Sequence, residues 1–207
     1  MIPNNSQIKQ WACRLGFDLV GIAPAAVIEY EQSLREYLNK GYQGHMRYLE
    51  RNVEQRTDPR KLMPEAKSII CTAMNYYAPL PEVVADDVHG KVARFAWGMD
   101  YHKVVREKLK RLTAIIRREV DRPVRLRCTV DTAPLAEKAH AARAGLGWIG
   151  KNGLLINEQY GSWLVLGEII TDLELEFDEP AAQRCGNCRR CIEACPVGAL
   201  VKDRVLE

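Results

Sequence analysis

Four of the seven cysteines crowd into one short segment, and this crowding constrains the chain more than any other feature of the sequence. The four are Cys185, Cys188, Cys191 and Cys195, which fall within 11 residues. The other three cysteines stand singly in apolar segments, where we expect small buried side chains. An odd number of cysteines and ligand-like clustering argue against a disulfide framework. We therefore expect the four clustered thiols to hold a metal centre.

The spacing of the cluster indicates which metal centre it holds. Cys-x2-Cys-x2-Cys-x3-Cys-Pro is the pattern of bacterial 4Fe–4S ferredoxins. Zinc favours two separated cysteine pairs or a mixture with histidine, and the sequence has no second pair. In ferredoxins with two clusters, the fourth cysteine of such a run ligates the other cluster. Either Cys195 completes a local cluster, or the chain is a fragment that lacks the second motif.

Composition places the chain among ordinary globular proteins. Hydrophobic residues make up 47% and charged residues 28% of its 207 residues, which excludes a fibrous or disordered protein. The most membrane-like stretch, 154–173, contains Glu158, Gln159 and Glu168 and is too polar to cross a bilayer. The N-terminus has neither the basic start nor the apolar core of a secretory signal. We expect a cytoplasmic protein with no membrane partner.

Hydrophobic periodicity predicts a mixed body of class α/β (α+β). Apolar residues at helical spacing indicate helices near 6–15, 30–38, 100–120 and 134–144, the first capped by Asn5 or Ser6. Apolar or alternating runs indicate strands at 17–23, 68–75, 124–130, 154–156 and 163–171, and 79–90 has the composition of a loop. The acidic stretch 172–180 has the composition of a linker. It divides the chain into a body, 1–180, and a cysteine segment, 181–207.

The positive charge is concentrated in one segment. Residues 103–127 contain ten Lys or Arg against three acidic residues, a local balance of +7, so the rest of the chain carries −4. Basic stripes are a footprint of nucleic-acid binding, but the solvated face of a helix gives the same pattern. Charge alone leaves both interpretations open.

Asp131 stands at the end of a predicted strand, between its apolar alternation and Pro134. Ligands often bind at the carboxyl ends of strands in α/β sheets, which makes this residue a candidate for a site. Asp131 or Thr132 is also well placed to cap the helix that follows. From the residues alone, the capping role is the simpler interpretation.

Several longer strings of residues carry a resemblance to a known family. They are 41–49 (GYQGHMRYL), 56–60 (RTDPR), 96–102 (AWGMDYH), 130–134 (VDTAP), 145–152 (GLGWIGKN), 160–163 (YGSW) and 167–168 (GE). Together with the cysteine motif they resemble epoxyqueuosine reductase, and the similarity runs from about Ile8 through Gly198.

The resemblance implies a cobalamin- and iron–sulfur-dependent oxidoreductase of queuosine biosynthesis. Such enzymes reduce epoxyqueuosine to queuosine at the wobble position of tRNA. Their cobalamin domain is similar to that of reductive dehalogenases and to nitroreductase-like folds, and a ferredoxin-like segment follows it. The family usually has two 4Fe–4S clusters and a longer C-terminal region of helical repeats. The second cysteine set and the repeats do not occur in this sequence, so it is similar to a C-terminally truncated member.

The resemblance also implies roles for particular residues. Asp131 matches the proton-donor position, since the oxygen expelled from an epoxide needs a proton and a carboxylic acid supplies it when burial or a nearby charge raises its pKa. The expected contacts of cobalamin are Arg56, Ala96, Asp131, Lys151 and Asn152. Arg56 is equally consistent with a surface charge, and the glycine-rich loop 145–153 with a plain connection. We expect His102 to cap a helix or pack, not to bind cobalt.

These observations leave three functional hypotheses. The first is an epoxyqueuosine reductase whose partners are tRNA and an unknown electron donor, acting as a monomer in the cytoplasm. The second is a corrinoid iron–sulfur reductase of a small molecule, similar to reductive dehalogenases. The third is a non-catalytic electron-transfer protein, although a ferredoxin needs no α/β body of this size.

Overall fold

A computed structural model of the chain describes residues 2–79, 90 and 92–207, so most of the predicted loop 79–90 lies outside the described residues. Its centre is a four-stranded sheet in the order β1-β2-β6-β3. The strands are β1 (Leu19–Pro24), β2 (Ser68–Asn75), β6 (Leu164–Thr171) and β3 (Leu126–Thr129). Every pairing in this sheet is antiparallel. The rule that ligands bind at the carboxyl ends of parallel strands therefore does not account for the position of Asp131.

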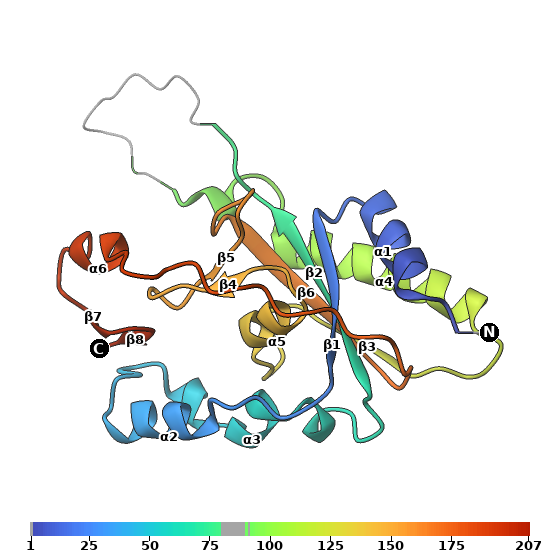
Figure 1. Ribbon diagram of the computed structural model, residues 1–207, viewed down its shortest axis with the longest axis horizontal. Coiled ribbons are helices and arrows are strands. Elements are labelled where there is room, and N and C mark those ends of the chain that lie inside the picture. Colours follow the sequence, from blue (N-terminus) through green and yellow to red (C-terminus); the bar gives the residue numbers. More distant parts are fainter. Residues whose placement is uncertain (1, 80–89, 91) are drawn as a thin grey trace.

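Helices cover both faces of the sheet (Figure 1). On one face lie α1 (Asn5–Arg14) and α4 (Tyr101–Glu119), which contact β1 and β6. On the other face, α5 (Glu137–Arg143) packs on β1, β2 and β6. Two apolar clusters result, one on each face of the sheet, because alternate residues of a strand point to opposite faces. Glu168 of β6 is a carboxyl group on the α5 face, between Leu166 and Ile170 in sequence.

The predicted periodic segments form, with shifted ends. The long helix predicted at 100–120 is confirmed as α4, and Asp100 caps it by accepting a hydrogen bond from the amide of His102. The first helix is capped by Asn4 and not by Asn5 or Ser6, because Asn4 and Gln7 bond reciprocally to each other's amides. The helix predicted at 134–144 begins only at Glu137. Further helices are α2 (Glu31–Asn39), η1 (Arg47–Glu50), α3 (Val53–Thr57), η2 (Pro59–Lys61) and η3 (Arg94–Ala96).

A small hairpin lies beside α5. The strand predicted at 154–156 becomes β5 (Leu155–Ile156), which pairs with the unpredicted β4 (Trp148–Ile149). Asn157 and Gly161 exchange backbone hydrogen bonds and so close the turn that follows β5. A Cβ on Gly147 would stand 2.2 Å from the carbonyl oxygen of Ile156, so only glycine fits this close approach.

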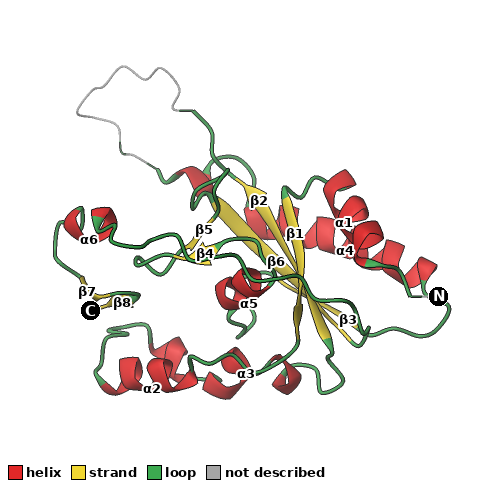
Figure 2. Cartoon of the chain, viewed as in Figure 1, coloured by secondary structure: helices red, strands yellow, loops and turns green. Residues whose placement is uncertain are grey.

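The stretch 172–180 is not a free linker. Leu173 and Leu175 are buried in the core, and the amide of Asp178 donates to the carbonyl of Ile22 in β1. Beyond it, loops connect α6 (Arg190–Glu193) to the hairpin of β7 (Leu200–Lys202) and β8 (Val205–Leu206), as Figure 2 shows. Among the described residues, no helix is both long and apolar enough to cross a membrane.

Candidate active site

Asp131 occupies a tight turn directly after β3. Its backbone lies in the left-handed region (φ 52°), which few residues other than glycine adopt without support. The support comes from Glu137, whose Oε1 accepts a hydrogen bond from the Asp131 amide at 2.5 Å. The capping alternative for Asp131 and Thr132 is wrong, because Ala136 is the N-cap of α5 and no side chain caps that helix.

Two side chains from the first turn of α4 hold the carboxylate of Asp131. The hydroxyl of Tyr101 donates to Oδ2 at 3.1 Å, and Nε2 of His102 lies 3.4 Å from the same oxygen. The other ring nitrogen of His102, Nδ1, lies 2.8 Å from Oδ1 of Asp100. The rings of Tyr101 and His102 stack with centroids 4.0 Å apart. His102 thus takes part in the cap of α4 through its amide, as expected, and its ring in addition links two carboxylates.

These contacts set the protonation of both rings. The hydrogen bond to Asp100 raises the pKa of His102, and the bond to Asp131 adds to this effect. Burial, followed by the charge of Asp131, raises the pKa of Tyr101 to about 12, so its hydroxyl stays a donor at neutral pH. The Asp131 side chain itself is 63% exposed. Protein atoms therefore leave this carboxyl group open to solvent.

Behind Asp131 lies a second pair of acidic groups that we did not predict. Glu168 is fully buried, and its Oε2 accepts from the hydroxyl of Thr129 at 3.0 Å. Glu137 lies in α5, which packs on β6, and its charge acts on Glu168. Burial raises the pKa of Glu137 to about 7, and burial followed by the charge of Glu137 raises the pKa of Glu168 well above its ordinary value. The sequence signal was a lone charge in the strand segment LVLGEIIT.

The first turn of α5 brings three predicted segments together. The carbonyl of Arg56 accepts from the amide of Ala136 at 3.1 Å. The amine of Lys138 donates to the carbonyl of Gly153 at 2.7 Å. Asp131 bonds to Glu137 in the same turn. Arg56, the loop 150–153 and Asp131 therefore all lie around the first turn of α5.

Ala96 reaches this neighbourhood through aromatic contacts. It ends η3, and the ring of the preceding Phe95 lies edge-on to Tyr101 at 6.3 Å. Phe95 is 49% and Met99 79% exposed, so an apolar surface flanks the Asp131 site. Such a surface suits a large flat ligand.

Lys151 and Asn152 are already engaged within the protein. The Lys151 amine lies 3.8 Å from Oδ2 of Asp203, and Oδ1 of Asn152 accepts from the amide of Leu154. Arg56 differs, because its Nε is buried without a hydrogen-bond partner, although its Nη2 donates to the carbonyl of Tyr48. An orphaned buried donor beside the exposed ring of Tyr48 fits a flat ligand that carries amide groups, as cobalamin does.

The four clustered cysteines are free thiols. Sγ of Cys195 accepts from the amide of Ala199 at 3.2 Å, and the backbone amides that follow it, Val197 first, lower the pKa of this thiol. A thiolate held by backbone amides suits an iron–sulfur ligand. In the part of the chain that the structure describes, no three potential ligand side chains gather as a metal site. The donor set thus fits an iron–sulfur cluster, while the four sulfurs do not converge.

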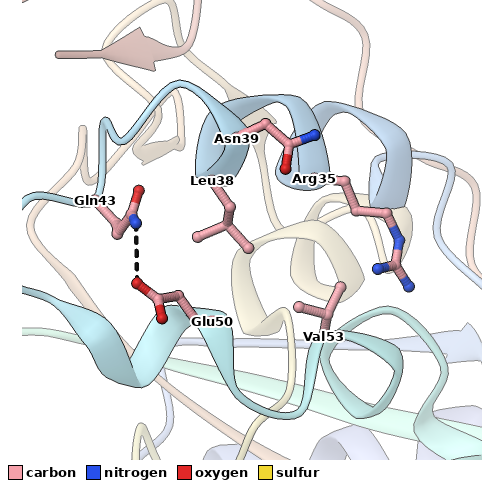
Figure 3. A pocket seen from close by; sticks show the side chains of 6 residues that line it. All are labelled: Arg35, Leu38, Asn39, Gln43, Glu50 and Val53. Carbon is pink, nitrogen blue, oxygen red and sulfur yellow. Dashed lines mark hydrogen bonds between the residues drawn. The ribbon is translucent and has the colours of Figure 1, made fainter.

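A cavity of about 450 Å³ lies elsewhere, between α2 and the segment of η1 and α3. Figure 3 shows Gln43 and Glu50 joined by a hydrogen bond of 3.0 Å across it. Its lining contains none of the candidate residues, and we assign it no role in the site.

The fold and the site define a mixed α/β domain with acid–base groups gathered where strand β3 ends. Residues 56–132 match the family model described as epoxyqueuosine reductase QueG, DUF1730. The chain is 44% identical over 191 residues to the epoxyqueuosine reductase of Synechocystis sp., covering 91% of this chain and 65% of that protein. It is 42% identical over 211 residues to that of Cyclobacterium marinum, covering 100% and 67%. The chain belongs to the epoxyqueuosine reductase family.

Solved structures agree with this assignment. An epoxyqueuosine reductase crystallised with a tRNA-Tyr epoxyqueuosine-modified stem loop has a TM-score of 0.90 and 34% identity, covering 97% of this chain and 54% of that one. The Bacillus subtilis enzyme, solved with its catalytic aspartate loop swung out of the active site, gives a TM-score of 0.89 at 32% identity with the same coverage. A reductive dehalogenase at 18% identity has a TM-score of 0.52 and covers 99% of this chain and 25% of its own, which shows the fold alone. The chain thus spans about half to two thirds of its relatives.

Proposed function

We propose that this chain provides the catalytic domain for the reduction of epoxyqueuosine to queuosine at the wobble position of tRNA. The observation that carries the proposal is that Tyr101 and His102 both contact the exposed carboxylate of Asp131 through their polar atoms. The family membership and the relative bound to a modified tRNA stem loop support it. The limited likeness to a reductive dehalogenase does not favour a small-molecule substrate, because it concerns the fold only.

Asp131 would act on the leaving oxygen. Two electrons and two protons convert an epoxide into an alkene and water, and the C–O bond breaks more easily if the oxygen is protonated as it leaves. Asp131, exposed at the site, supplies that proton. His102, whose pKa is raised, lies on the same carboxylate and is placed to return a proton to it. Tyr101 fixes the orientation of the carboxylate.

The turn that carries Asp131 would move during the cycle. In the Bacillus subtilis relative the catalytic aspartate loop is swung out of the active site. The Asp131 turn is exposed and left-handed in this chain, so a few hydrogen bonds decide its position. We propose that it is the corresponding loop.

Cobalamin would bind against the exposed apolar surface of Phe95 and Met99, with Arg56, Ala96, Asp131, Lys151 and Asn152 around it. When bound, it supplies the electrons that break the C–O bond. The orphaned Nε of Arg56 supports a contact with an amide of the ligand. Lys151 and Asn152 would have to exchange their present partners or bind through the backbone.

An iron–sulfur cluster on Cys185, Cys188, Cys191 and Cys195 would pass electrons to this site. We divide the chain accordingly into a catalytic domain, 1–180, and a 4Fe–4S segment, 181–207. The amide cradle of Cys195 supports its role as a thiolate ligand. We expect a cytoplasmic monomer that takes electrons from a separate donor.

The basic face of α4 would attract the tRNA. Its exposed residues Lys103, Arg106, Lys110 and Arg117 follow one side of the helix, and the N-terminal turn of that helix holds Asp131. Phosphate contacts of this kind position a nucleic acid without reading its sequence.

A single-turnover assay tests the proposal. The chain is incubated with epoxyqueuosine-bearing tRNA, cobalamin and a strong chemical reductant, and conversion is followed by mass spectrometry of the nucleosides. Asp131→Asn is expected to slow conversion at least about 100-fold while tRNA binding is kept, because the amide cannot protonate the oxygen. Glu174→Gln is the control, because this exposed carboxylate pairs with Lys67 and contacts no described residue of the proposed site. Equal rates for Asp131→Asn and the parent chain would remove Asp131 from the mechanism.

A further inference from the structure

The buried carboxyl pair behind Asp131 has a consequence for protonation. Two ionised carboxylates only accept hydrogen bonds and repel each other, so two such groups placed together where α5 packs on β6 require a proton on one of them. Glu168 is the better holder of that proton, because it is fully buried against the apolar face of the sheet while Glu137 is only partly buried.

The hydrogen bonds of each oxygen agree with this distribution. Oε2 of Glu168 accepts from Thr129, and its Oε1 is buried without a hydrogen-bond partner, which an ionised oxygen would not tolerate but a protonated one that donates toward Glu137 would. With the proton on Glu168, Glu137 accepts from the Glu168 hydroxyl in addition to the amide of Asp131, whose nitrogen lies 2.5 Å from its Oε1. An ionised acceptor makes the second bond a charge-assisted one, which is about twice as strong as a neutral bond.

We propose that Glu137 and Glu168 share one proton and that this pair, through the bond from Glu137 to the Asp131 amide, holds the Asp131 turn in its working position. The inference rests on the proposed function for the importance of Asp131. Neither glutamate touches a reacting atom, so both are positioning residues. Asp131 needs such a fixture because its left-handed backbone is costly to maintain.

The groups that the structure describes around Glu137 and Glu168 include no cation that would allow both carboxyl groups to be ionised. Of the strands that α5 packs against, β1, β4 and β5 contain no titratable residue. The titratable groups that face the pair from the remaining elements are Cys71 of β2, Tyr101 and His102 of α4, Lys138 of α5 and Asp131 itself. Arg127 of β3 donates to the carbonyl of Leu62. Among the described residues, no cation forms an ion pair with Glu137 or Glu168 that would remove the need for a shared proton.

Two measurements on the full chain test the proposal without any activity assay. The first is the infrared spectrum at pH 8.5 with glutamate carboxyl groups isotopically labelled. A protonated carboxylic acid band is expected in the parent chain and is expected to vanish in Glu168→Gln, whose amide donates permanently to Glu137. If the parent chain shows no such band, the shared proton is refuted.

The second measurement is amide hydrogen exchange across residues 130–136. Glu137→Ala is expected to speed exchange at Asp131 at least 10-fold, because its acceptor is lost. Glu137→Gln and Glu168→Gln are expected to stay within threefold of the parent chain, since each keeps an oxygen for the Asp131 amide. The control is Glu107→Ala on the exposed face of α4.

The pattern of variants separates a positioning role from a loss of packing. If Glu137→Ala and Glu137→Gln speed amide exchange at Asp131 equally, or if neither does, the positioning role of Glu137 is refuted. The outcome does not depend on cobalamin, iron or tRNA, so a failure here is distinguishable from a failure of the proposed function.

Discussion

At the scale of single residues, the site is a set of proton positions around one exposed carboxylate. His102 bridges Asp100 and Asp131, and this arrangement keeps its imidazolium form present at higher pH than in a free histidine. The same contacts give Asp131 a neighbour that can return a proton after each turnover.

The charge of His102 leads to a pH prediction. Because the folded pKa of His102 is raised, the bond of its charged form to Asp131 is present below the ordinary histidine pKa and is lost as the pH rises through the raised value. We expect the single-turnover rate to fall on that alkaline limb. His102→Gln should lower the rate at neutral pH about 10-fold and flatten the limb, which a series of rate measurements from pH 6 to 9 checks. An unchanged limb in the variant would assign the titration to another group.

The sequence identified part of this site. Asp131 follows from the end of an alternating strand together with the family resemblance, and the structure places Arg56 and Ala96 in its neighbourhood. Glu137 and Glu168 could not be paired from the sequence, because their contact depends on α5 crossing the face of β6. The bond from His102 was missed for a related reason. A histidine two residues after a cap carries no local sign of a partner 29 residues away.

At the scale of elements, the predicted and observed helices agree in their periodic centres and differ at their ends. The apolar stripe of α4 was evident, since Val105, Leu109, Leu112 and Ile116 are all buried. The cap of α1 was misplaced because the run of three polar residues at its start offers several equivalent oxygens. The late start of α5 has a tertiary cause, as the Asp131 turn takes up the preceding residues.

The capping box of α1 gives a prediction for stability. Asn4→Ala removes the oxygen that accepts from the amide of Gln7, and it should lower the free energy of unfolding by about 1 kcal/mol. Ser6→Ala, which alters the residue that the sequence favoured as a cap, should cost less than about 0.5 kcal/mol. Urea unfolding followed by circular dichroism compares the two. Equal losses would mean that the box does not stabilise the helix.

At the scale of the whole molecule, the charge distribution links the long helix to the site. The exposed basic residues of α4 run away from the turn that holds Asp131, so a polyanion attracted to this face is guided toward the carboxylate. Because the net charge of the whole chain is only +3, the attraction for a polyanion comes from this helix face and not from the protein as a whole.

Salt dependence tests the charged face. Replacing Arg106, Lys110 and Arg117 together by glutamine should weaken tRNA binding about 10-fold or more at low salt. It should also reduce the slope of log Kd against log salt by about one to three, one for each lost phosphate contact. The matched control changes Arg14, Lys40 and Lys202, which lie outside α4. If both triple variants bind equally, the tRNA uses another face.

The contact between Asp178 and β1 also bears on how the chain avoids self-association. β1 is an edge strand, and an open edge is a template for pairing with another molecule. Asp178 occupies this edge at Ile22, donating its amide to the carbonyl and accepting the strand amide at 2.8 Å through Oδ2. Lys9 of α1 forms an ion pair with the other carboxylate oxygen of Asp178 and so helps to hold Asp178 at this edge. The segment 172–180 thus blocks this edge of β1 against pairing with another molecule, and its acidic composition adds charge where a second sheet would have to dock.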